Sequence, residues 1–111
     1  MSIEQEQHWI TGEEFGRERR RLIEAGVPDE DPRFRALYDR VVARDEYLYE
    51  RYGKPYLESQ PGKWIAISVD GEVLIRGTSG QAIWAAAERF GDGNFALRKL
   101  ADFPGYEMPF R

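Results

Sequence analysis

Residues 62–80 read GKWIAISVDGEVLIRGTSG, and this stretch decides the fold. Two apolar runs flank Asp70–Gly71, a pair typical of a tight hairpin turn because glycine tolerates a positive φ and aspartate does so better than most residues. The pattern predicts two antiparallel strands over residues 63–69 and 72–76. Both faces of the first strand are largely apolar, so we expect both to be at least partly covered.

The residues after the hairpin predict a helix and a third strand. The segment TSGQAIWAAAERFG has capping-box spacing between Thr78 and Gln81, and Gly91 is expected to end the helix. The segment GDGN turns the chain, and FALRKL predicts a strand. A right-handed crossover makes this strand parallel to the second one, so we expect it beside the first strand and antiparallel to it. The expected buried face of the helix consists of Ile83, Ala86, Ala87 and Phe90, and Trp64 and Trp84 are expected in the core.

Two further helices are predicted before the hairpin. The first begins with capping-box spacing between Thr11 and Glu14 and ends near Gly26. The second begins at Asp31–Pro32, where Asp31 caps the helix and proline occupies its first position. Apolar residues recur at helical spacing up to Gly53, which we expect to end this helix.

The predicted fold class is therefore α+β, with two N-terminal helices followed by a small ββαβ unit whose three-stranded sheet is mixed. A chain of 111 residues favours one domain. Its predicted parts are a polar N-terminal arm over residues 1–10, a segment of two helices over 11–53, and a ββαβ domain with an irregular C-terminal tail over 54–111. Within the arm, only Trp9 and Ile10 are expected to be fixed.

Three segments, ERYGKPYLES, GKWIAISVDGEVLIRG and AAAERFGDGNFALRKL, together resemble a family of small bacterial proteins of unknown function. Its pattern is a GKW(I/V)A(I/V)S-x-DG hairpin followed by a helix and an FGxGxF step. The resemblance covers roughly residues 50–100. It implies a ββαβ domain and no particular reaction. Residues 1–32 and the tail from Asp102 lie outside the likeness.

The composition excludes several kinds of site. The chain has no cysteine and one histidine, His8. Disulfides, thiolate metal sites and a histidine-rich metal site are therefore excluded. Because the one histidine lies near the terminus, we also exclude a Ser-His-Asp triad within one chain. We predict no catalytic, cofactor-binding or metal-ligating residue, no cofactor and no small-molecule site.

Location and charge lead to further expectations. No apolar run approaches the roughly 20 residues that a membrane-spanning helix needs. The start, MSIEQEQHWI, lacks the basic and apolar regions of a signal peptide. Together with the absence of cysteine, this predicts a cytoplasmic protein with no membrane partner. The formal net charge of −4 provides no overall attraction to nucleic acid.

Aromatic residues make up 14% of the chain, and tyrosines surround the second predicted helix and its exit. They fit either a recognition surface or the rim of a small core. A short sheet also leaves open edges, which often pair with other chains. We therefore predict a non-catalytic protein-interaction or assembly module that forms a homo-oligomer or grips a protein partner. The candidate interface residues are Trp9, Tyr38, Tyr49, Tyr52, Tyr56, Tyr106 and Phe110.

One basic cluster supports an alternative function. The segment GRERRR brings together Arg17, Arg19, Arg20 and Arg21 on the first predicted helix. They could contact the phosphates of a nucleic acid, as in a small nucleic-acid-associated regulator. Interleaved glutamates and the acidic total favour a solvated helix face instead. A third alternative is an enzyme whose site forms only between chains.

Overall fold

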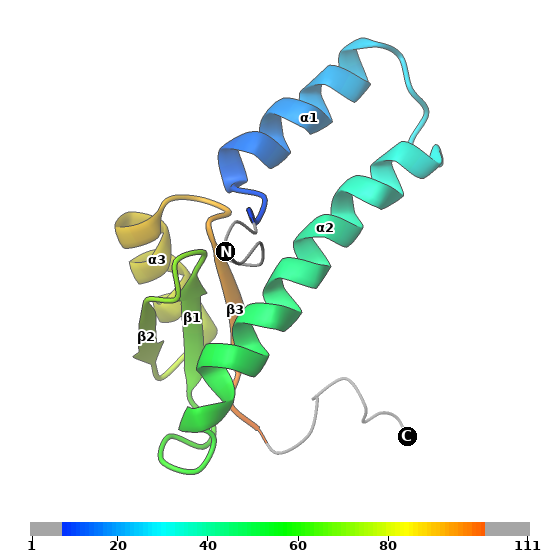
Figure 1. The fold of residues 1–111 in the computed structure, drawn as a ribbon. Helices are drawn as coiled ribbons and strands as arrows, with labels where there is room; N and C mark the ends of the chain where they lie inside the picture. The colour runs from blue at the N-terminus through cyan, green and yellow to red at the C-terminus, as the bar shows by residue number, and fades with distance from the viewer. Residues whose placement is uncertain (1–7, 102–111) are drawn as a thin grey trace, which may run out of the picture.

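The elements follow one another in the predicted order and form three layers (Figure 1). The computed structural model describes residues 8–101. Helix α2 and the turns after it cover one face of the sheet, α3 covers the other, and α1 runs beside the first half of α2, beyond the sheet. This confirms the α+β class with two helices followed by a ββαβ unit. The elements are α1 (Gly12–Glu24), α2 (Pro32–Leu48), β1 (Trp64–Ser68), β2 (Val73–Arg76), α3 (Ser79–Phe90) and β3 (Phe95–Lys99).

The sheet has the strand order β2-β1-β3. β3 lies beside β1, as the crossover rule predicts, and runs in the same direction as β2. Because β2 and β3 do not pair, both ladders are antiparallel, and the expectation of a mixed sheet is corrected. The hairpin strands are also slightly shorter than predicted. The Ser68 hydroxyl accepts hydrogen bonds from the amides of Asp70 and Glu72, which draws the chain into a turn at Gly71, where φ is 92°.

Side chains from both faces of the sheet are buried, as expected. On the α2 side, the main cluster contains Leu48, Tyr49, Ile65, Ile67, Ala96 and Leu100. On the α3 side, Ala66 of β1 and Ala82 and Ala86 of α3 have no exposed surface. Alanines on this helix allow its backbone to approach the sheet closely. The core therefore has a thick aliphatic layer on one side and a thin alanine layer on the other.

The predicted buried face of α3 is partly wrong. Ala86 is buried and Phe90 and Ala87 are half-buried, but Ile83 is 46% exposed and Ala82 takes the central place. Ala82 and Ala86 are one turn apart on the same face of the helix. A sheet of three strands covers only a narrow stripe of α3, and Ile83, one residue further round, lies outside it.

The end of α2 also differs from the prediction. The α-helix ends at Leu48, and the chain continues through a π-helical turn, Tyr49–Gly53, and a 3₁₀ turn, Lys54–Tyr56. Gly53 has a right-handed backbone (φ −90°), so it does not act as a left-handed stop. A Cβ atom at Gly53 would lie 2.6 Å from the Tyr49 ring. Glycine therefore serves close packing at this position.

The predicted helix caps are confirmed. The Asp31 carboxylate accepts from the Arg33 amide at 2.9 Å, and the Thr78 hydroxyl accepts from the Gln81 amide at 3.1 Å. In α1 the capping box is complete, because Thr11 Oγ1 accepts from the Glu14 amide and Glu14 Oε1 accepts from the Thr11 amide. No side chain of α1 is fully buried. No helix within residues 8–101 is both long enough and apolar enough to cross a membrane.

The capping box makes the stability pH-dependent. The hydrogen bond from the Thr11 amide, and then the contact with His8, lowers the pKa of the Glu14 carboxyl below 4.5. An ionised Glu14 therefore contributes stability that is fully present above about pH 4.5 and is lost as the pH falls through the lower folded-state pKa. We expect Glu14→Gln, which keeps an oxygen acceptor, to be less stable than the wild type at pH 7. The gap should close between pH 5 and pH 3 in urea unfolding, whereas a pH-independent gap would contradict this assignment.

Candidate functional site

An open groove lies between the edge strand β2 and helix α3. Its volume is about 810 Å³. We call it the β2–α3 groove. Its lining includes Leu74 and Arg76 from β2 and Gln81, Trp84, Glu88 and Arg89 from α3. The groove exists because β2 is the last strand on its side of the sheet and α3, which packs over the middle of the sheet, leaves the outer side of this strand uncovered.

Trp84 is the most exposed large apolar side chain among the described residues. It is 67% exposed, and the expectation that it belongs to the core is wrong, whereas Trp64 is half-buried. The physical reason is the spacing on α3: a helix that packs on the sheet through Ala82 and Ala86 directs position 84 away from it. Exposed apolar surface of this kind often marks an interaction site when it is contiguous, and Trp84 lines the same groove as Leu74.

The outer edge of β2 presents unpaired backbone groups. The Ser68 amide donates to the Glu72 carbonyl at 2.8 Å, and Leu74 pairs with Ala66 in the same ladder. Hydrogen-bonded and non-hydrogen-bonded residues alternate along an antiparallel strand. Leu74 therefore directs its amide and carbonyl toward β1, while Val73 and Ile75 direct theirs away from the sheet. The Ile75 carbonyl is covered by its neighbour, because Arg76 Nη1 donates to it at 2.8 Å.

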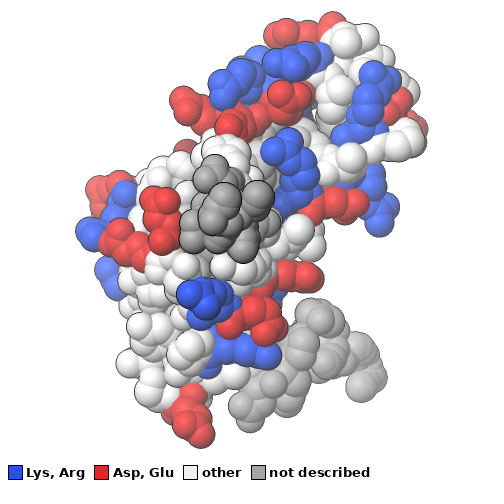
Figure 2. All heavy atoms as spheres, viewed as in Figure 1, with Lys and Arg blue, Asp and Glu red and all other residues white. Residues whose placement is uncertain are grey.

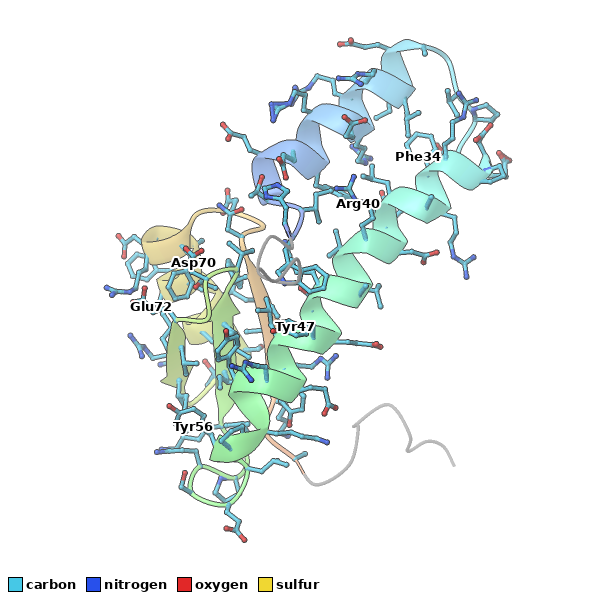
Figure 3. The ribbon with its side chains drawn as sticks, in the orientation of Figure 1. Phe34, Arg40, Tyr47, Tyr56, Asp70 and Glu72 are labelled. Carbon is cyan, nitrogen blue, oxygen red and sulfur yellow. The ribbon has the colours of Figure 1, made fainter. Side chains whose placement is uncertain are left out.

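Charges of both signs border this edge. Glu72, the residue just before β2, forms an ion pair with Arg89 of α3, and both side chains are exposed. Arg76, at the end of the strand, is exposed as well. Glu72 lies at the outer margin of the sheet in Figure 3, close to Asp70 in the hairpin turn. The edge thus has an acidic residue at one end and a basic residue at the other.

The predicted interface residues on α2 and its exit do not form one surface. Tyr49 is only 8% exposed and belongs to the core, where burial raises the pKa of its hydroxyl. Tyr52 is half-buried, and its ring lies against Gly71 in the hairpin turn. Tyr56 is 37% exposed near the far end of the sheet (Figure 3). Tyr106 and Phe110 lie outside the described residues.

The remaining two predicted interface residues pack against other aromatic rings. Trp9 is half-buried, and its ring centroid lies 5.1 Å from that of Tyr47. Tyr38 is 44% exposed, contacts Phe15 of α1 edge to face, and accepts a hydrogen bond from Arg19 at 3.2 Å. These rings join α2 to the segments that precede it in the sequence, so much of their surface is already occupied.

The arginine cluster forms an exposed face of α1. Arg17, Arg19, Arg20 and Arg21 are all exposed. Arg21 pairs with Glu18 at 3.5 Å, and Arg19 contacts Tyr38. Figure 2 shows acidic atoms interspersed with the basic atoms over α1. Opposite charges so close together weaken the field that a phosphate backbone would meet.

Sequence reasoning missed Arg44, a buried arginine in α2. It is 2% exposed, and its guanidinium donates to the carbonyl oxygens of Ile10 (2.9 Å), Gly93 (2.8 Å) and Phe95 (3.2 Å), and to Asp45 Oδ1 (2.8 Å). Burial raises the pKa of the Asp45 carboxyl, and the nearby Arg44 and Arg98 offset this only in part. The available signal was position: Arg44 falls on the apolar stripe of α2, seven residues after Leu37 and four before Leu48.

The start of α1 meets the turn between α3 and β3, a contact that the sequence analysis also missed. The turn follows Gly91 as predicted. The Gly12 amide donates to Asn94 Oδ1 at 2.6 Å, and Asn94 Nδ2 donates in turn to the Phe90 carbonyl at 3.0 Å. Gly93 has a φ of 75°, and a Cβ atom there would lie 2.9 Å from the Gly12 Cα atom. Two backbones can approach so closely because both positions are glycine.

Within residues 8–101, no three acidic or histidine side chains lie close enough together to hold a metal ion. Comparison with protein-family models, with curated proteins and with solved structures found no match to this chain. The resemblance to a bacterial family therefore stays a prediction. The structural feature that points to a function is the open edge of β2 beside the groove that Trp84 lines.

Proposed function

We propose that this protein is a non-catalytic protein-interaction module that binds a partner chain at the edge of β2 and in the β2–α3 groove. The observation that carries the proposal is an edge strand with outward backbone groups at Val73 and Ile75, next to a tryptophan that is 67% exposed. The proposal keeps the interaction function predicted from the sequence and places it on different residues.

The backbone supplies the first half of the argument. An edge strand presents a row of unpaired amides and carbonyls, and a partner strand can add to it through main-chain hydrogen bonds. Such an added strand gains its specificity from pockets that receive alternate side chains. Here the residues beside the edge form a groove of about 810 Å³ that could receive them.

The side chains supply the second half. Tryptophan is enriched among the few residues that dominate binding energy in protein interfaces. Burying a large apolar side chain stabilises a protein or complex by roughly 1.5–3 kcal/mol, and Trp84 does not contribute this while it stays in water. A partner that covers Trp84 and Leu74 recovers this gain.

A site-specific photo-crosslink tests the proposal. We would place benzoylphenylalanine at Gln81, an exposed groove residue, and, as a matched control, at Arg35 on the exposed face of α2. We expect irradiation of the full chain, purified or in a lysate of the source cells, to yield a heavier product only from the Gln81 site. Adding Trp84→Ser should abolish it, and mass spectrometry should map the attachment point on the partner chain.

The same experiment can overturn the proposal. A Gln81 site that yields no product in either preparation, or the same products as the Arg35 site, would remove the groove as a specific binding surface. A product that survives Trp84→Ser would also argue against it. Circular dichroism of the variant should match the wild type, because Trp84 lies outside the core.

A further inference from the structure

We propose that the partner at this surface is a second copy of the same chain, joined through β2 about a two-fold axis to form a continuous six-stranded sheet. This inference rests on the proposed function, since it uses the same edge and groove. A two-fold interface requires a patch that is complementary to itself. The backbone, the charges and the apolar side chains of β2 each meet that requirement.

The backbone fits a two-fold axis that passes beside Leu74. If two β2 strands lie antiparallel with Leu74 opposite Leu74 of the second copy, Val73 lies opposite Ile75 of that copy. These are the residues whose amides and carbonyls point away from β1, so each such pair can exchange N–H···O bonds. Leu74 then occupies the non-hydrogen-bonded position between them, which agrees with its pairing toward Ala66. Pairing replaces the bond from Arg76 to the Ile75 carbonyl with one from the second copy's Val73 amide.

The charges select this register. Glu72 and Arg76 stand two residues before and after Leu74, so each lies directly opposite its counterpart of unlike charge in the second copy. Facing residues in a non-hydrogen-bonded pair have Cα atoms about 4.5 Å apart, and unlike charges there stabilise the ladder. With the axis at Val73 or Ile75 instead, the backbone could still bond, but Glu72 would no longer face Arg76. The charges therefore favour the register with the axis at Leu74 over the registers with the axis at Val73 or Ile75.

The apolar side chains fill the space that this pairing creates. A two-fold axis perpendicular to the sheet places both α3 helices on the same face. Helix α3 contacts all three strands and thus lies over the middle of its sheet, above β1. Between the two β1 strands there are then three strand spacings, about 14 Å. Packed helices usually lie 8–10 Å apart, so large side chains must fill the extra space between the two α3 helices. Trp84 lines the groove between α3 and β2 and is placed to do so in each copy.

The chain is well suited to a cysteine test, because it contains no native cysteine. In the proposed dimer, residue 74 faces itself at a Cα separation of about 4.5 Å, within the range that a disulfide spans. We expect Leu74→Cys to form a covalent dimer on mild oxidation. Arg35→Cys, which is exposed but distant from the axis, should form no covalent dimer under the same conditions. Wild-type chain should show a dimer mass by light scattering that decreases on dilution.

A charge swap tests the register independently of the cysteine. Glu72→Arg places two arginines opposite each other, and Arg76→Glu places two glutamates opposite each other, so each variant alone should be monomeric. A mixture of the two restores an unlike pair at both positions and should give a mixed dimer. Both side chains are exposed, so neither change removes a core contact.

The outcomes separate this inference from the proposed function. A wild-type chain that stays monomeric at every concentration, with no Leu74→Cys dimer, would overturn self-pairing. A Gln81 photo-crosslink to a different protein would then still support an interaction module. Covalent dimers from Leu74→Cys combined with mixed dimers only from the charge-swapped pair would establish both the partner and the register.

Discussion

Replacing Arg44 with alanine is expected to lower the free energy of unfolding by about 3–5 kcal/mol, as for other buried ion-pair partners. The substitution removes the donors to three backbone carbonyls, at Ile10, Gly93 and Phe95, and leaves Asp45 without its cation. Buried acceptors without a partner incur their full desolvation cost. A domain of this size has a total stability of about 5–15 kcal/mol, so the variant should be close to unfolding in mild conditions. Urea unfolding monitored by circular dichroism measures the change.

Arg35→Ala on the same helix is the matched control. Arg35 is exposed and pairs with Asp39 at 3.4 Å, and exposed pairs of this kind contribute about 0–1 kcal/mol. Arg44→Lys should recover only part of the loss, because one ammonium group cannot reproduce the planar fork that reaches three carbonyls and a carboxylate. A loss below 1 kcal/mol in Arg44→Ala would show that water takes over these acceptors and that Arg44 does not hold the elements together.

Replacing glycine with alanine should have opposite effects on the free energy of unfolding at two positions of α1. Gly12→Ala places a Cβ atom 2.0 Å from the Asp92 carbonyl oxygen, so the start of α1 must move away from the α3–β3 turn. Overpacking of this kind costs about 1–3 kcal/mol. At Gly16 the nearest atom is the end of the Arg20 side chain, at 3.9 Å, and an alanine there should stabilise the helix by about 0.5–1 kcal/mol.

Thermal and urea unfolding of the two variants, side by side with the wild type, would measure this opposition. Gly93→Ala provides an independent check, because it strains a backbone with φ of 75° and intrudes on Gly12 from the other side of the contact. Equal effects of Gly12→Ala and Gly16→Ala would mean that helix propensity alone governs α1 and that its contact with the turn contributes nothing.

The features that sequence reasoning predicted are those governed by neighbouring residues. Thr11, Asp31 and Thr78 cap helices through bonds that reach only two or three residues along the chain. Asp70–Gly71 sets the hairpin turn in the same way. The place of β3 followed from the handedness of the crossover, a rule that needs only the order of the elements. Local chemistry and topology were therefore enough for the architecture.

The candidate site could not be predicted in the same way, because it depends on which face of each element is covered. Tyr49 and Trp84 are both aromatic residues at helical spacing, yet one is buried and the other is 67% exposed. The difference arises from the narrow sheet and from the alanines that bring α3 close to it. Arg44 likewise gains its role from carbonyls 34 to 51 residues away. The helical periodicity of apolar residues does not predict contacts between residues so far apart in the sequence.

The absence of a fully buried side chain in α1 has a consequence for the cooperativity of the molecule. The helix is fixed at its first residues, where Gly12 contacts the α3–β3 turn and Arg44 donates a hydrogen bond to the Ile10 carbonyl. Its far end lies beside the first turns of α2 (Figure 1), where Phe34 and Leu37 are buried. Burial of each is worth roughly 1.5–3 kcal/mol, which is well below the cost of unfolding the whole sheet. Amide hydrogen exchange along α1 should accordingly quicken from Gly12 toward Glu24. We therefore expect two cooperative units of unequal stability, a sheet that opens only globally and a helix α1 that opens first at its C-terminal end.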